Sequence, residues 1–197
     1  MEELVSSIRK RYLEVFSNHV GSADGTPMYT ADLVMFGILD RQIGLIESMP
    51  AIFESKNIHA LAPLLRVQLD SLLRLHAFRI VEDPQDLAQH IIKGKSLRKY
   101  KDRNGKDLFD RHLVNTLKMD LPWVESMYET LSGWVHLSES HIFSVVSEGQ
   151  EEREIRVGVG SFREDLPEGL FTEAREALIE IHANTANLIE AYFASTR

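Results

Sequence analysis

Residues 64–84 read LLRVQLDSLLRLHAFRIVEDP, and this stretch decides the fold. It belongs to a longer segment, residues 59–81, that has the most hydrophobic helical pattern in the chain. Apolar side chains fall on every side of its helical wheel and leave no wide polar face. Such a helix is stable when neighbouring elements cover it, so we expect it to be buried in a bundle of helices.

A ladder of three charged residues lies within this apolar helix. Arg66, Asp70 and Arg74 stand at i, i+4 and i+8, so the carboxylate can pair with either guanidinium. Because burying an unpaired charge is costly, one interpretation is a structural lock between helices. The other is a wall of two arginines that binds a small anionic ligand.

Apolar residues at spacings of three and four, with proline and glycine at the breaks, predict the remaining helices. These lie at residues 4–16, 32–50, 84–103, 108–117 and 122–138 and from residue 168 onward, with a further turn at 51–53. We therefore predict a mainly α protein, a single domain over residues 1–197 with six to seven helices in one bundle.

The helical pattern of apolar residues ends near residue 140, and the residue types change. Residues 141–146 (HIFSVV) and 155–160 (IRVGVG) are rich in β-branched side chains and flank an acidic loop, residues 147–154. This pattern predicts a small β-hairpin near residues 141–160, with Ile155, Val157 and Val159 on one face.

The last helix carries an apolar stripe at alternating spacings of three and four residues. Its members are Phe171, Ala174, Leu178, Ile181, Thr185, Leu188 and Tyr192. A stripe of three heptads is long enough for a homodimer contact, but we favour packing within the chain's own bundle.

Composition excludes several classes of protein. The chain has 197 residues, 44% hydrophobic and 26% charged, as is typical of a globular domain. It has no cysteine, which excludes disulfides, thiolate metal sites and a cysteine nucleophile. The sequence shows no secretory leader and no apolar stretch of membrane-spanning length, so we expect a cytoplasmic protein with no membrane association.

The net charge of −8 conceals a basic patch at residues 93–106. This segment has one acid and seven basic residues, namely Lys93, Lys95, Arg98, Lys99, Lys101, Arg103 and Lys106. A solvated helix face and turn is one interpretation, and a surface for an anion or nucleic acid is the other.

The segment YETLSGWVHLSESH, residues 128–141, is unusually polar for a buried helix. Tyr128, Ser132 and His136 fall at i, i+4 and i+8, so a phenol, a hydroxyl and an imidazole share one face. For His136 we favour a core histidine that is hydrogen bonded to Tyr128, Ser132 or the Arg66 helix.

Two catalytic uses of this segment have weaker support. His136, Glu139 and His141 do not converge on one helical face, and the HExxH spacing is absent, so we predict neither a metal site nor a cofactor. Ser132 is not in a GxSxG elbow, which argues against nucleophilic catalysis.

The two segments at 64–84 and 128–141 together resemble bacterial helical domains with an Arg-x-x-x-acid helix and a later Tyr-x-x-x-Ser-x-x-x-His helix, some of them HEPN-like. This resemblance implies a helical bundle in which one polar pocket collects Arg66, Asp70, Tyr128, Ser132 and His136. HEPN ribonucleases cleave RNA without metal, with an arginine and a following histidine separated by four to six residues, usually across a dimer. No arginine stands at that spacing before His136, so its partner would come from another helix, such as Arg66 or Arg74.

Two functions follow as expectations. The first is a non-enzymatic regulatory or ligand-binding domain, a homodimer in which Arg66, Asp70, Arg74, Tyr128, Ser132, His136 and His141 form the binding cluster. The alternative is a metal-independent, HEPN-like ribonuclease or toxin. In it His136 would transfer protons, Arg66 and Arg74 would stabilise phosphorane charge, and residues 93–106 would hold the RNA backbone. A histidine–carboxylate metalloenzyme is a distant third.

Overall fold

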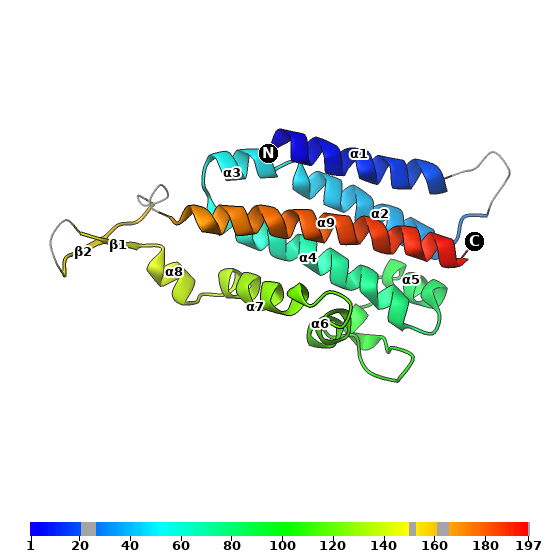
Figure 1. Ribbon diagram of the computed structural model, residues 1–197. Helices are drawn as coiled ribbons and strands as arrows, with labels where there is room; N and C mark the ends of the chain where they lie inside the picture. Colours follow the sequence, from blue (N-terminus) through cyan, green and yellow to red (C-terminus); the bar gives the residue numbers. More distant parts are fainter. Residues whose placement is uncertain (21–26, 150–152, 161–165, 197) are drawn as a thin grey trace.

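The computed structural model describes residues 1–20, 27–149, 153–160 and 166–196, and it confirms the mainly α fold with a small hairpin. In these ranges the elements are α1 (Glu2–His19), α2 (Thr30–Ile46), α3 (Met49–Glu54), α4 (Ile58–Ile80), α5 (Pro84–Ile92), a 3-10 turn η1 (Leu97–Lys99), α6 (Asp110–Leu117), α7 (Trp123–Val135), α8 (Glu139–Phe143), β1 (Val146–Glu148), β2 (Ile155–Val157) and α9 (Glu168–Thr196). The long helices form one bundle, and the α8–β1–β2 segment projects from one end of it (Figure 1).

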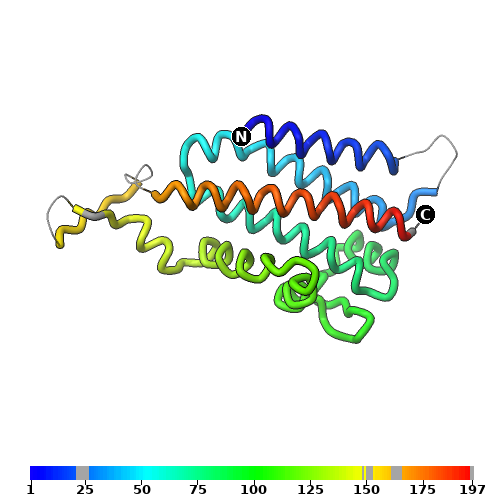
Figure 2. The backbone as a smooth tube through the Cα atoms, viewed as in Figure 1, coloured from blue at the N-terminus to red at the C-terminus, as the bar shows by residue number. Residues whose placement is uncertain are grey.

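Helix α4 is the centre of the bundle, as its sequence predicts. It packs most extensively against α9 and α7, and also contacts α2, α3, α5 and α6. Leu61, Leu69 and Leu73 are fully buried, on a helix whose inward residues extend over most of its circumference. The tube view shows α9 running along α4 for most of its length (Figure 2).

The apolar stripe of α9 packs inside the bundle. Phe171, Leu178, Ile181 and Thr185 are buried against the helices of the same chain. The prediction that this stripe packs within the chain's own bundle is therefore confirmed. Its buried residues are not exposed for contact with a second copy.

Helix α5 is shorter than the sequence predicts. Asp83 begins it by accepting hydrogen bonds from the backbone N–H groups of Gln85 and Asp86, at 2.7 and 3.1 Å. Gly94 then adopts a left-handed conformation, with φ +71°, which ends the helix. The basic patch consequently lies on a loop and the turn η1, and the prediction that it lies on a helix was wrong.

The hairpin is also smaller than predicted, because residues 139–143 form helix α8. The Ser138 hydroxyl and the His141 ring complete a capping box at its first turn. These local hydrogen bonds outweigh the β-propensity of Ile142 and Phe143. Val146 pairs with Val157, and Glu148 with Ile155, while Val159 lies beyond the strand. Part of the predicted acidic loop, residues 150–152, lies outside the described ranges.

A buried polar chain ties three long helices together. The ring of His182 on α9 lies between the Tyr12 hydroxyl on α1, 2.6 Å from Nδ1, and Gln68 Oε1 on α4, 2.7 Å from Nε2. Because an amide oxygen only accepts, Nε2 donates to Gln68. Burial lowers the pKa of His182 to about 3, so the ring is neutral near pH 7 and its Nδ1 accepts from the Tyr12 hydroxyl.

None of the helices in the described part of the chain combines the length and the hydropathy that crossing a bilayer requires.

Stability should fall as the pH falls below 6.5. Burial, together with the nearby Arg79, also lowers the pKa of His76, to about 4. Between about pH 6.5 and 4 the unfolded chain binds a proton at His76 and at His182, whereas the folded protein does not. Each histidine should then raise the unfolding equilibrium constant up to about tenfold per pH unit, measured by urea denaturation between pH 7.5 and 4.5.

His182→Gln should make this pH dependence shallower by about one proton. The matched control is the same substitution at an exposed position, His136→Gln, against which the change in slope is measured. Equal slopes in wild type and His182→Gln would mean that His182 is not held neutral by the fold.

Candidate functional site

The predicted ladder on α4 is completed by a carboxylate from another helix. Arg74 donates to Asp70 at 2.9 and 3.3 Å on its own helix and to Asp110 at 2.7 Å on α6. Asp110 is the first residue of α6, where a negative charge also interacts favourably with the helix dipole. We call Arg66, Asp70, Arg74, Asp110, Tyr128 and Ser132 the polar cluster.

Arg66 joins α7 to this cluster through longer contacts. Its guanidinium stacks over the Tyr128 ring, 4.1 Å from the centroid, and its Nε lies 3.5 Å from Ser132 Oγ. Its terminal nitrogens lie 3.7 Å from both Asp70 and Asp110. The structure thus brings together Arg66, Tyr128 and Ser132, which the sequence placed on facing helices.

The electrostatics of the cluster are internally balanced. Burial opposes ionisation of Asp110, but Arg74, and then Arg98 and Arg66, hold the pKa of its carboxyl below the usual range. The Arg74 pKa is raised despite burial, because Asp70 and Asp110 both flank it. Asp110 therefore occupies the place where the sequence predicted a bound anion, between the two arginines of α4.

His136 lies outside the polar cluster. Helix α7 ends at Val135, and His136 is extended, with φ −103° and ψ 150°, so the i+8 relation to Tyr128 is lost. The helix stops because the Ser138 hydroxyl donates to the Gly133 carbonyl at 2.7 Å, which satisfies an acceptor of the last turn. His136 is exposed, and among the described residues its side chain has no contact with Arg66. The prediction of a buried, hydrogen-bonded histidine was wrong.

His141 belongs to a different cluster, at the start of α8. Its ring stacks on His59 at 5.5 Å and lies 5.3 Å from the ring of Trp134. No three histidine or carboxylate side chains of the described residues are arranged to hold a metal ion.

The basic patch divides into structural and exposed members. Arg103 donates to the carbonyls of Arg79, Ile80 and Val81 and so caps the end of α4. Arg98 lies 3.5 Å from Asp110, and Lys101 lies 3.9 Å from Asp107. Lys93, Lys95 and Lys99 are exposed and form no ion pair with a described residue.

An arginine and a histidine with the spacing of HEPN ribonucleases do occur on α9. This pair was not predicted from the sequence. Six residues separate Arg175 from His182. Arg175 is exposed, whereas His182 is buried and hydrogen bonded to Gln68. The pair therefore does not form an accessible site within this chain.

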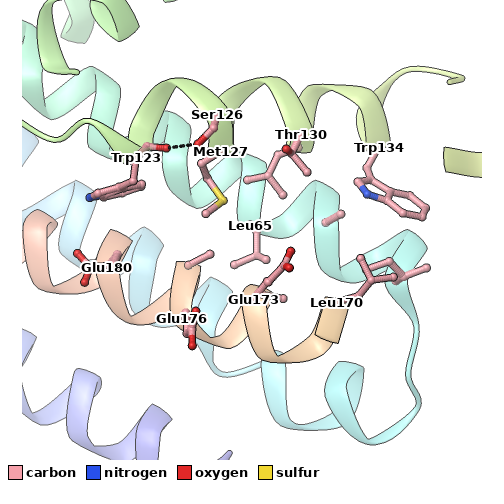
Figure 3. A pocket seen from close by; sticks show the side chains of 15 residues that line it. Leu65, Trp123, Ser126, Met127, Thr130, Trp134, Leu170, Glu173, Glu176 and Glu180 are labelled. Carbon is pink, nitrogen blue, oxygen red and sulfur yellow. Dashed lines mark hydrogen bonds between the residues drawn. The ribbon is translucent and has the colours of Figure 1, made fainter. Parts of the chain in front are cut away.

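A groove between α7 and α9 is the second candidate site, and the sequence did not reveal it. Its cavity volume is about 340 Å³. Ile58, Ala62 and Leu65 of α4 line the groove, and Leu65 lies at its floor between α7 and α9 (Figure 3). Met127 points into the groove, Trp123 lies at one end, and Trp134 at the other. Trp123, the first residue of α7, is half-buried and packs against the core at its end of the groove.

One rim of the groove is acidic. Glu173, Glu176 and Glu180 stand at i, i+3 and i+7 on the exposed edge of α9 (Figure 3). None of the three forms an ion pair with a described residue, although Glu180 accepts a hydrogen bond from Asn184 at 3.2 Å. The groove therefore combines an apolar floor with an uncompensated negative edge.

Comparisons with protein-family models, with curated proteins and with solved structures found no match to this chain. The candidate sites therefore rest on geometry alone.

Asp110→Ala should destabilise the protein, because it leaves Arg74 partly buried without its shortest partner. Breaking a buried pair costs about 3–5 kcal/mol, and the 16–25% exposure of these side chains reduces this to about 2–3 kcal/mol. The measurement is the free energy of unfolding in urea. Asp107→Ala, at the more exposed pair with Lys101, is the control and should change it by less than about 1 kcal/mol.

The same variant tests whether Asp110 takes the place of an anion. Phosphate should raise the melting temperature of Asp110→Ala and leave that of the wild type unchanged, because only the variant exposes the arginine wall. Equal phosphate effects on both proteins would contradict this role of Asp110.

Proposed function

We propose that this protein is a non-enzymatic binding domain that holds an elongated, mainly apolar ligand in the α7–α9 groove. The observation that carries the proposal is the groove itself: an apolar floor, a tryptophan at each end and polar residues along the rim. Ligand sites are characteristically concave and apolar, with a few polar groups that orient the ligand. The two tryptophans are eleven residues apart on one helix, about 16 Å, so the ligand is elongated.

The polar cluster holds helices together and is not itself a binding site, which supports this assignment. Its arginines already bind Asp70 and Asp110, so it fixes α6 and α7 on α4 and leaves no unpaired carboxylate or accessible arginine pair. In this proposal Arg66, Asp70, Arg74, Tyr128 and Ser132 position the groove's wall and do not themselves contact the ligand.

The ribonuclease alternative has less support. It needs an arginine and a histidine that meet at an accessible surface. Arg66 is stacked on Tyr128 beneath α7, and His136 makes no contact with it among the described residues. The basic patch beside it is partly committed to capping α4 through Arg103.

A charge placed in the groove wall tests the proposal. The wild type should bind the neutral apolar probe N-phenyl-1-naphthylamine, with a rise in its fluorescence, and Met127→Lys should weaken binding at least about tenfold. Met119→Lys makes the same change at an exposed methionine outside the groove and should bind like the wild type. Absence of binding to the wild type, or equal binding to Met127→Lys, would refute the groove as a site.

We also propose that the projecting arm, α8–β1–β2, joins two copies of the chain. Phe143 and Val157 are 72% and 67% exposed, and Ile142 and Ile155 are similarly exposed. A two-stranded sheet of three pairs is marginal in water, and among the described residues no further strand pairs with either of its edges. Pairing one edge with the same edge of a second copy is self-complementary under two-fold symmetry, which favours a homodimer.

Sedimentation should then show a dimer of the wild type at micromolar concentration. Phe143→Glu should give a monomer, because the charge would be buried in the contact. Leu33→Glu, a matched change at an exposed leucine on α2, should remain dimeric. A wild type that sediments as a monomer would refute the arm contact.

A further inference from the structure

We infer that the ligand of the α7–α9 groove is an amphipathic helix of another protein, with basic residues along one flank. This inference rests on the proposed function, because it names the partner of the same groove. Three features support it: the length of the groove, the composition of its walls and the position of its charges.

The length of the groove fits a helix of about three turns. Trp123, Met127, Thr130 and Trp134 stand at i, i+4, i+7 and i+11 and form one stripe along α7. A partner helix that lies along this stripe spans the same eleven residues and presents side chains at i, i+3 or i+4, i+7 and i+11.

Both walls of the groove are helices that already pack on α4. A helix in the groove would contact α7 on one side and α9 on the other, and its apolar side chains would meet Leu65 and Met127 between them. This is the geometry by which helices pack ridges into grooves, so the partner would extend the bundle by one member.

The carboxylates on the α9 edge of the groove predict that the partner helix has basic residues on the side that faces them. Glu173, Glu176 and Glu180 form a row of three carboxylates, spaced at three and four residues, on the α9 edge. A helix beside α9 that carries lysine or arginine at the same spacing places one cation against each carboxylate. The tryptophan rings at the two ends also favour a cation over an anion.

The experiment uses three 15-residue peptides and the full chain. The first is a leucine–lysine peptide with helical spacing, the second has glutamate in place of lysine, and the third has the leucines and lysines of the first in alternating order. Calorimetry should show binding of the first peptide, at least about tenfold tighter than of either other peptide, and weaker binding at 300 mM than at 50 mM sodium chloride.

A triple variant tests whether the acidic rim of the groove causes the preference for the leucine–lysine peptide. Glu173→Gln, Glu176→Gln and Glu180→Gln together should weaken the leucine–lysine peptide about tenfold, because three exposed ion pairs are lost. The control neutralises three exposed carboxylates that do not line the groove, Glu3, Asp40 and Glu82, and should bind like the wild type. Binding of N-phenyl-1-naphthylamine should be the same in all three proteins, because the groove floor is unchanged.

The outcomes separate the two proposals. Probe binding without preference for the leucine–lysine helix overturns the partner and leaves the groove as a site. Equal affinity for the helical and alternating peptides overturns the helix and indicates charge attraction alone. Self-association that Met127→Lys abolishes overturns it as well, because a second copy would then fill the groove. Failure of the wild type to bind either probe or peptide overturns both proposals.

Discussion

The fold depends on one constraint: α4 has apolar residues on most of its circumference and therefore has to be covered on nearly every side. Among the described residues six helices pack on α4, and three of its buried or half-buried polar residues pair with a different one of them. Gln68 binds His182 of α9, Arg74 binds Asp110 of α6, and Arg66 contacts Ser132 of α7. Because a polar group left unpaired in the interior costs free energy, these pairs also fix which helix lies on which side of α4.

The groove is a consequence of this arrangement. Helices α7 and α9 both pack on α4, and no other helix of the described residues covers the surface of α4 between them. Its two walls have different chemistry. On α7 the residues that face the groove are aromatic, apolar or hydroxylic, whereas the exposed edge of α9 carries three carboxylates. A ligand in the groove is therefore oriented by charge on one side and by apolar contact on the other.

The sequence predicted local features well and tertiary partners poorly. Helical periodicity located the long helices and the shared face of Tyr128 and Ser132, whereas their meeting with Arg66 of α4 was implied only by the resemblance to HEPN-like domains. Asp110 was missed because an acid in the first turn of a helix is common, and its pairing with Arg74, thirty-six residues away, leaves no local pattern. His136 was misplaced because the end of α7 depends on one hydrogen bond from Ser138 to Gly133. The groove did have a signal, since Trp123 and Trp134 share a face and three glutamates follow at three and four on α9, but only the packing on α4 brings these two helices side by side.

The polar cluster and the groove are connected through α7. Tyr128 and Ser132 on one side of α7 contact Arg66, while Trp123, Met127 and Trp134 on the adjacent side form the groove wall. The position of that wall relative to α9 therefore depends partly on Arg66. Arg66 contacts α7 by stacking on the Tyr128 ring, 4.1 Å from its centroid, and by a 3.5 Å contact with Ser132, whereas Arg74 holds α6 through one hydrogen bond of 2.7 Å to Asp110. Arg66 therefore couples the polar cluster to the groove wall, because the same guanidinium that lies beside Asp70 and Asp110 also contacts Tyr128 and Ser132 of α7.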